Sequence, residues 1–183
     1  MAMDREQVLR AAATVLARKS TATMDEVARA AGIGRATLHR HFAGRAALVK
    51  ALEALGIQEF EAAVDRAGID RGDTVDGLRR LIAEMEPVAE LLAFLVTENE
   101  LFEGNEIDEG WARLDARVSA LFRRGQEEGA FRIDLPAAWL TEALYGLIGS
   151  CAWAAMDGRV AKNDFQFMIA ELLLGGARRS VQK

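Results

Sequence analysis

Residues 24–42 read MDEVARAAGIGRATLHRHF, and this stretch decides the fold. A helix is predicted to begin after Thr23, because Thr23 and Glu26 stand at the spacing of a capping box. Gly32 is expected to end that helix, since glycine adopts the left-handed conformation at little cost. A second short helix follows over residues 35–41. Two short helices joined by a glycine-containing turn have the spacing of a helix-turn-helix.

The second short helix is predicted to present a polar, basic face to solvent. Leu38 and Phe42 recur at helical spacing and should face inward. The remaining positions hold Arg35, Ala36, Thr37, His39 and Arg40. An α-helix fits the major groove of DNA, where arginine donates two hydrogen bonds to guanine. Residues 30–43 contain no Asp or Glu that would repel phosphate. This face therefore predicts DNA binding, with an ordinary packed helical hairpin as the alternative.

Charge is distributed unevenly along the chain. The whole chain carries a formal net charge of -5. Residues 1–55 hold nine Lys or Arg and five Asp or Glu, a net charge of +4, whereas residues 56–183 carry -9. This asymmetry is typical of a DNA-binding end joined to a body with another task, although a solvated basic face gives the same sum.

The fold class is predicted to be all-α. The 183 residues include only two prolines, and 51% are hydrophobic. Helices are expected over residues 4–19, 24–31, 35–41, 45–64 or beyond, 75–85, 87–101, 107–128, 136–156 and 163–178. Glycines 104, 129 and 158 mark helix ends, and the polar segment 68–73 is expected to join the two parts. An N-terminal three-helix DNA-binding domain (1–55) is thus linked by a long fourth helix to a C-terminal helical domain (56–183).

The sequence lacks the residues that several classes of function require. The sequence has no Gly-rich phosphate loop, paired metal-ligand motif or nucleophilic serine motif. His39 and His41 point in different directions on a helix and cannot share a metal ion. Cys151 is alone, and the most apolar run, 143–156, is too short to span a membrane. No signal peptide is recognisable. We expect a cytoplasmic protein that is not an enzyme, with no metal, cofactor or membrane partner.

Residues 23–48, with AAGIGRATLHRHF followed by AGRAAL, resemble the signature segment of the tetracycline-repressor (TetR) family. The segment covers about 26 of the 183 residues. The resemblance implies a four-helix DNA-binding head and a larger body that binds an inducer and dimerises. The family usually has Tyr where His39 stands, so a phosphate contact there becomes shorter and pH-sensitive. Ser is also common where Gly34 stands, and Gly caps a helix without a side-chain acceptor.

The resemblance also implies which residues contact double-stranded DNA. They are Thr23, Arg35, Ala36, Thr37, His39, Arg40, His41 and Arg45. The first three residues of the second short helix would face bases, and His39 and Arg40 would reach base edges or the backbone. Thr23 and Arg45 would contact phosphates, and His41 would brace the end of the reading helix or touch the backbone. A two-fold homodimer places its reading helices about one DNA turn apart, roughly 34 Å, and so predicts a palindromic operator.

The helix over residues 138–156 is apolar or small on nearly every face. Such a helix must be buried all round. In a final pair of helices, the rest of the chain can cover one side of this helix but is too small to cover the other. We interpret the last two helices as a four-helix interface with a second copy, with a purely internal core as the alternative. The expected contacts are Tyr145, Gly149, Ala152, Met156, Phe165, Ile169 and Leu173.

Large apolar residues of the body are candidates for lining an inducer pocket. They are Met85, Phe94, Leu95, Trp111, Phe122, Tyr145 and Trp153. Such a lining suits an apolar or aromatic small molecule, although ordinary core is the alternative. Pivoting of the fourth helix about Gly68 would then transmit ligand binding to the head. The sequence thus predicts a TetR-like repressor released by a small-molecule inducer. The alternatives are a helical scaffold dimer that does not bind DNA and an activator of the same family.

Overall fold

A computed structural model describes residues 5–97 and 106–178, with side chains placed for 5–95 and 109–178. Every regular element in these ranges is a helix, which confirms the predicted all-α class. The longer helices are α1 (Arg5–Arg18), α2 (Met24–Ala30), α3 (Arg35–His41), α4 (Arg45–Ala67), α5 (Thr74–Met85), α6 (Ala89–Thr97), α7 (Glu106–Glu127), α8 (Ala137–Met156) and α9 (Phe165–Ala177). Two short 3₁₀ helices are η1 (Glu86–Val88) and η3 (Lys162–Asp164). No helix in the described ranges is long and apolar enough to cross a membrane.

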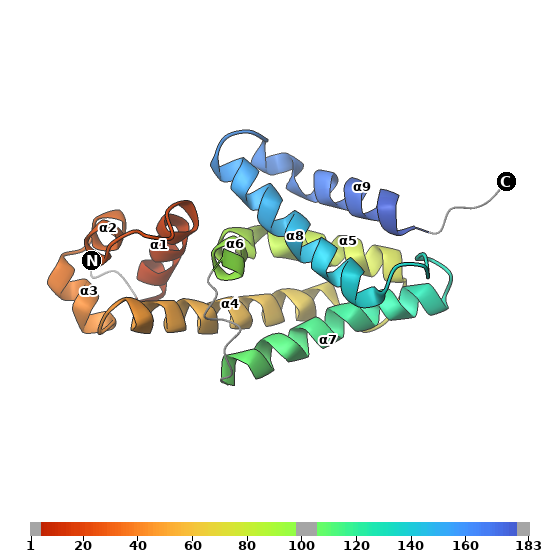
Figure 1. Cartoon of the computed structure of the whole chain (residues 1–183), viewed down its shortest axis with the longest axis horizontal. Coiled ribbons are helices and arrows are strands. Elements are labelled where there is room, and N and C mark those ends of the chain that lie inside the picture. Colours follow the sequence, from red (N-terminus) through yellow and green to blue (C-terminus); the bar gives the residue numbers. More distant parts are fainter. Residues whose placement is uncertain (1–4, 98–105, 179–183) are drawn as a thin grey trace.

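Local sequence signals fix the ends of the head helices. The backbone N–H of Glu26 donates to Thr23 Oγ1 at 3.3 Å, and the N–H of Thr23 donates to Glu26 Oε2 at 2.7 Å. This reciprocal pair is the predicted capping box at the start of α2. Gly32 has a φ of +65°, which ends α2 as expected. Helices α1 to α3 then gather with the first half of α4 at one end of the elongated molecule (Figure 1).

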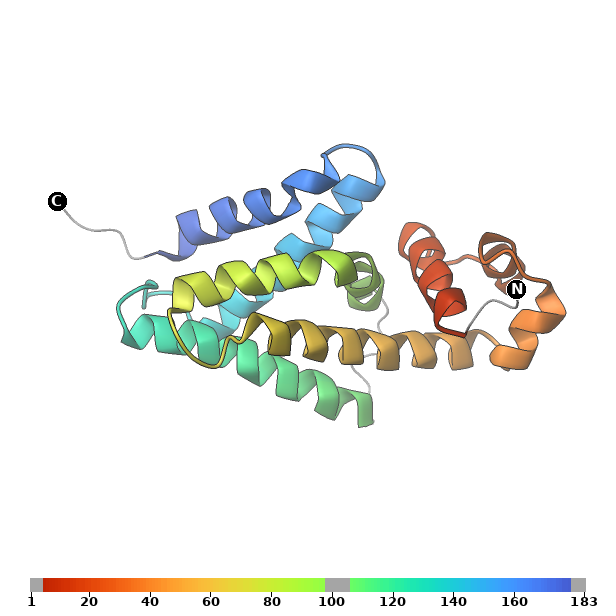
Figure 2. The same cartoon turned by 180° about the vertical axis from the view of Figure 1, so that it is seen from behind.

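The described apolar side chains form two cores that share helix α4. The head core extends along α4 as far as Leu55, and the body core takes over from Ile57 and Phe60. Viewed from behind, α4 runs from the head along the body beneath α5 (Figure 2). Because one rigid helix belongs to both cores, the position of the head is tied to the packing of the body.

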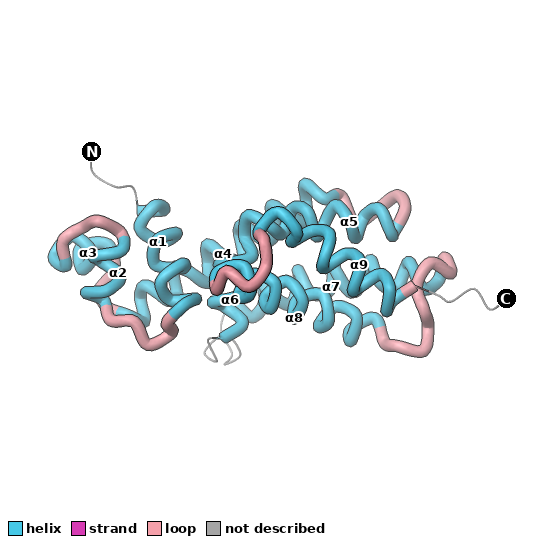
Figure 3. Tube along the Cα trace, turned by 90° about the horizontal axis from the view of Figure 1, so that it is seen from above, coloured by secondary structure: helices cyan, strands magenta, loops and turns pink. Residues whose placement is uncertain are grey.

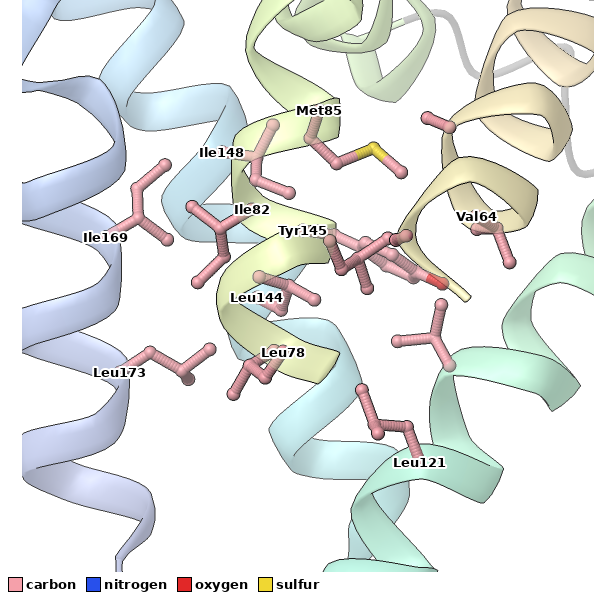
Figure 4. Packing of buried hydrophobic residues seen from close by; sticks show 14 of the residues in the cluster. Val64, Leu78, Ile82, Met85, Leu121, Leu144, Tyr145, Ile148, Ile169 and Leu173 are labelled. Atoms are coloured by element: carbon pink, nitrogen blue, oxygen red, sulfur yellow. The ribbon is translucent and has the colours of Figure 1, made fainter. Parts of the chain in front are cut away.

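The body core is formed by side chains from α4, α5, η1, α6, α7, α8 and α9. Leu78 and Ile82 of α5 lie between Leu144 of α8 and Ile169 and Leu173 of α9 (Figure 4). Each of these side chains is at most 5% exposed. Burying a side chain of this size contributes about 1.5–3 kcal/mol, so this layer stabilises the body.

The structure departs from the predicted element boundaries at a few places. Segment 68–73 was expected to join head and body, but it connects α4 to α5 at the end of α4 far from the head (Figure 1). Pro87 lies inside η1 instead of opening a helix, and α9 begins at Phe165 after a 3₁₀ turn. The expected helix end at Leu101 and the glycine at 104 lie outside the described residues.

Candidate nucleic-acid interface

Helix α3 lies at the extreme end of the molecule, away from the body (Figures 1 and 3). Its Arg35, Ala36, His39 and Arg40 are exposed, and Thr37 is half-buried. These predicted reading residues therefore share one accessible end of the chain. The described part of the chain covers Thr37 in part and leaves the other four exposed.

Two buried side chains anchor α3 from behind. Leu38 is fully buried and Phe42, at the C-terminal cap, is 2% exposed, as the helical spacing predicts. The Arg5 guanidinium lies 5.0 Å from the centre of the Phe42 ring, which is a cation–π distance. Because the anchors face the head core, the rigid helix keeps its polar side chains outward.

The two arginines of α3 are already partly oriented. Arg35 Nη1 donates to Asp25 Oδ2 at 3.3 Å, and Arg35 Nε lies 3.3 Å from Asp25 Oδ1. Arg40 Nη2 donates to Thr37 Oγ1 at 3.2 Å. Both guanidinium groups keep further N–H groups for other acceptors, since arginine has five donors. The arrangement presents two cations whose remaining donors suit guanine or phosphate oxygens.

The other predicted DNA contacts have different surroundings. Arg45 is half-buried and donates from Nη1 to the carbonyl of Ala22 at 3.1 Å and from Nη2 to the carbonyl of Ser20. Its guanidinium thus holds the loop before α2, and the contact of Arg45 with phosphate stays a prediction. Thr23 is exposed and caps α2. His41 is half-buried, with its ring centre 6.2 Å from that of Phe42.

The capping carboxylate of α2 is held ionised. Lys19 Nζ donates to Glu26 Oε1 at 2.7 Å. This hydrogen bond, together with those from the backbone and hydroxyl of Thr23, lowers the pKa of Glu26 to about 2. The loop between α1 and α2 is therefore tied to α2 by charge and to α4 by the Arg45 hydrogen bonds.

The predicted dimer contacts lie mostly inside the chain itself. Tyr145, Ala152, Phe165, Ile169 and Leu173 are each at most 8% exposed in the single chain. Buried side chains have little surface left for a second copy, and a dimer contact through these five stays a prediction. Gly149 and Met156 are half-buried. Among the described residues, the exposed large apolar side chains are Ile133, Trp139, Phe167 and Leu172, at 78%, 59%, 67% and 65% exposed.

The structure does not bring the predicted ligand-lining residues to one place. Phe94 and Leu95 of α6 pack into the head core, whereas Met85 and Phe122 are buried in the body core. Trp153 and Tyr145 line one hollow of about 540 Å³ beside α8, together with Ala93, Gly149, Ser150 and Arg159. Trp111 is half-buried against the body core.

Three aromatic rings meet in the body. Trp111 of α7 lies 5.6 Å from Phe60 of α4 and 5.5 Å from Tyr145 of α8, measured between ring centres. Phe60 and Tyr145 meet edge to face at 5.7 Å. The buried Tyr145 hydroxyl has no hydrogen-bond partner among the described residues. Burial raises the pKa of Tyr145, and the charges of Asp115 and Glu142 raise it further.

Asp25 is a partner of α3 that was not predicted from the sequence. The available signal was an acidic residue in the first turn of one helix of a helix-turn-helix, where the first residue of the second helix comes close. The exposed Trp139 and Leu172 were also missed, since an all-apolar helix gives no sequence signal for which face stays outside.

Comparison with known proteins finds regulators of one family. The family model "Bacterial regulatory proteins, tetR family" matches residues 8–52. The chain is 33% identical over 174 residues to the HTH-type transcriptional regulator NfxB of Pseudomonas aeruginosa, covering 94% of this chain and 93% of NfxB. It is 29% identical over 154 residues to the HTH-type transcriptional repressor LfrR of Mycolicibacterium smegmatis, covering 84% and 80%. The crystal structure of LfrR from Mycobacterium smegmatis in complex with proflavine matches with a TM-score of 0.75 at 25% identity, covering 96% and 97%.

Proposed function

Because the chain belongs to the tetR family of bacterial regulatory proteins, and is thus a transcriptional regulator, we propose that it is a homodimeric repressor. Each copy would read half of a palindromic operator through α3, and a small aromatic molecule would release the dimer from DNA. The observation that carries this proposal is the protruding α3, anchored by Leu38 and Phe42, with Arg35 and Arg40 outermost.

Residues of α3 would divide the work of DNA recognition. Arg35 and Arg40 would donate to guanine edges or phosphates, and the Thr37 methyl group would meet thymine. His39 and Ala36 would complete the contact surface of the helix. Arg45 would act from behind, because it fixes the loop before α2 through two backbone carbonyls. Phosphate neutralisation by these cations would make the affinity fall steeply with salt.

The homodimer would form through the exposed faces of α8 and α9. A hollow of about 460 Å³ runs between these helices, lined by Trp139, Gly146, Leu147, Leu172 and Gly176 among others. The glycines leave room for close helix approach, and the large apolar side chains would fill the hollow of the other copy. A two-fold axis here would repeat each contact twice and set two α3 helices toward one DNA face.

The ligand would bind in the body near the ring cluster of Phe60, Trp111 and Tyr145. The buried Tyr145 hydroxyl lacks a partner within residues 5–97 and 106–178, so a ligand that accepts its hydrogen bond would remove the cost of leaving it unpaired. Aromatic rings at 5.5–5.7 Å provide stacking faces for an aromatic molecule. The relative LfrR was crystallised in complex with proflavine, an aromatic compound, which supports this ligand class.

Helix α6 would transmit the ligand signal to the head. Its Leu91, Phe94 and Leu95 pack in the head core, while Leu92 and Ala93 pack in the body core. Moving α6 therefore repacks both cores at once, a more direct path than the pivot about Gly68. A ligand can shift DNA affinity only by the difference in its own affinity for the two conformations.

The DNA step is tested by selecting bound fragments from random duplex DNA with the full chain. A palindrome with half-sites about one turn apart is expected, with affinity that falls linearly on a log–log salt plot. The double variant Arg35→Ala/Arg40→Ala should lose sequence preference while keeping its helical circular dichroism. Recovery of no enriched sequence, even at low salt, would refute the proposal.

The dimer and ligand steps have separate tests. In analytical ultracentrifugation the native chain should sediment as a dimer, and Leu172→Arg should sediment as a monomer. The control variant Ala112→Arg, at an exposed position of α7, should remain a dimer. A monomeric native chain would exclude the two-fold arrangement. Titration with proflavine should quench tryptophan fluorescence and release bound DNA. Quenching without release would leave a binder that is not the inducer.

A further inference from the structure

We propose that Asp25 is a positioning residue for DNA readout, which holds Arg35 so that Arg35 selects one guanine in each half-site. The proposal rests on the proposed DNA-binding function. It adds a residue of α2 to the recognition surface and gives Arg35 the specific task of reading guanine.

The geometry is an ion pair between the two side chains that contains one hydrogen bond. Arg35 Nη1 donates to Asp25 Oδ2 at 3.3 Å, and Arg35 Nε lies 3.3 Å from Asp25 Oδ1. Asp25 belongs to the first turn of α2 and Arg35 opens α3, so each partner is set on a separate short helix. The carboxylate thus accepts one hydrogen bond from Nη1, lies close to Nε, and spans the turn between the helices.

The Arg35 guanidinium has more N–H donors than its contact with Asp25 uses. A guanidinium has five N–H groups, one on Nε and two on each Nη atom. The hydrogen bond to Asp25 uses one hydrogen of Nη1. The Asp25 hydrogen bond leaves the other Nη1 hydrogen, both Nη2 hydrogens and the Nε hydrogen for DNA. Two neighbouring donors of this set match the O6 and N7 acceptors of guanine in the major groove. Asp25 and a guanine can therefore bind Arg35 at the same time.

The pair matters more on DNA than in the free protein. Side chains of Arg35 and Asp25 are 69% and 52% exposed, and such surface pairs contribute little to folding stability. When α3 lies in a DNA groove, water is removed from around the Arg35–Asp25 pair, and the attraction between the two charges becomes stronger. Arg35 also neutralises Asp25, which would otherwise be repelled by phosphates. Asp25 spares Arg35 part of the entropy cost of ordering a flexible side chain on binding.

A rival role for Asp25 makes the opposite prediction. If the carboxylate merely competed with DNA for Arg35, its removal would strengthen binding to every sequence by the same factor. Positioning instead predicts that removal weakens the preference for guanine at one base pair. Sequence preference at that base pair is a readout that overall fold stability does not change.

The test is a double-variant cycle on the operator recovered from random DNA. Fluorescence anisotropy gives the affinity of the full chain for that operator and for copies with each guanine changed to adenine. Arg35→Ala should reduce the preference for guanine at one position per half-site by about 5- to 150-fold. In the native chain, Asp25→Asn should reduce the same preference for guanine by about 2- to 10-fold. In a chain that already carries Arg35→Ala, Asp25→Asn should not change this preference.

A matched control comes from the body. Asp76 also lies in the first turn of a helix, and its Oδ1 lies 3.5 Å from Arg79 Nη1. Asp76→Asn should leave the guanine preference at its native value. Thermal melting of Asp25→Asn should stay close to that of the native chain, which shows that α2 is intact.

Each outcome decides between the interpretations. A uniform gain in affinity for all sequences with Asp25→Asn would overturn the positioning role in favour of competition. An equal effect of Asp25→Asn with and without Arg35 would overturn it as well. If the native chain enriches a palindrome but the cycle shows no coupling, only this inference fails. If the native chain enriches no DNA, the proposed function fails with it.

Discussion

At Gly56 the helices α4 and α6 leave no room for a side chain, and Gly56→Ala tests how strongly the two helices are coupled. A Cβ atom at Gly56 would lie 2.2 Å from Leu95 Cδ1 and 3.6 Å from Leu91 Cγ. Ordinary carbon contacts are about 3.5–4.0 Å, so Leu95 has to move. Leu95 is 1% exposed and packs in the head core, which leaves it no open solvent to move into.

Two opposing effects set the size of the change. Alanine is favoured over glycine inside a helix by about 1 kcal/mol. Overpacking a buried contact costs about 1–3 kcal/mol. We therefore expect Gly56→Ala to lower the free energy of unfolding by about 0–2 kcal/mol. For a chain of this size that is a fall in Tm of up to about 8 °C.

The exposed Ala54 of the same helix supplies the control. Ala54→Gly should cost about 1 kcal/mol from helix propensity alone, because its side chain contacts solvent. Both variants are melted at one fixed protein concentration, since the stability of a dimer depends on concentration. If Gly56→Ala raises Tm by as much as Ala54→Gly lowers it, Leu95 yields without cost and the tight coupling of α4 to α6 is refuted.

Three further predictions concern the head and the body. Leu38→Ala leaves a cavity at a fully buried site behind α3 and should lower the free energy of unfolding, measured with denaturant, by about 2–5 kcal/mol. The variant should also lose the gel shift. Native DNA affinity in this variant would contradict the anchoring role of Leu38. Glu26 has its pKa lowered from 4.5 to about 2, so its carboxylate stabilises the head fully above pH 4.5 and loses that effect as pH falls to about 2. The Tm difference between the native chain and Glu26→Gln should therefore be largest near neutral pH and vanish near pH 2; a difference independent of pH would reject this assignment. Tyr145→Phe removes a buried hydroxyl that has no partner in the part of the chain that the structure describes. It should stabilise the free chain by about 1–3 kcal/mol while weakening ligand binding, and a lower Tm would show that the hydroxyl is bonded.

The head could be predicted from sequence almost residue by residue. Thr23 and Glu26 form the capping box, and Gly32 takes the left-handed conformation that ends α2. Leu38 and Phe42 are buried as their spacing predicts. These features depend on contacts between residues a few positions apart, so the local sequence contains the information that fixes them.

The body could be predicted only as a set of helices. An apolar pattern around all of α8 predicts burial but not which face meets the chain's own core. Tyr145 and Ile169 were therefore assigned to an interface, whereas the fold buries them and leaves Trp139 and Leu172 exposed. For a similar reason the sequence did not show which core Phe94 joins, because only the packing of α6 turns that side chain toward the head.

By itself the sequence determined the helices, the helix-turn-helix and the family, because capping, glycine conformation and helical spacing act over a few neighbouring residues. Only the tertiary structure decided that Arg45 holds backbone carbonyls, that Asp25 meets Arg35 and that α6 belongs to both cores. Each of these contacts joins elements whose relative placement depends on the packing of the whole chain. The reach of a long charged side chain and the free face of an apolar helix are settled only by that packing.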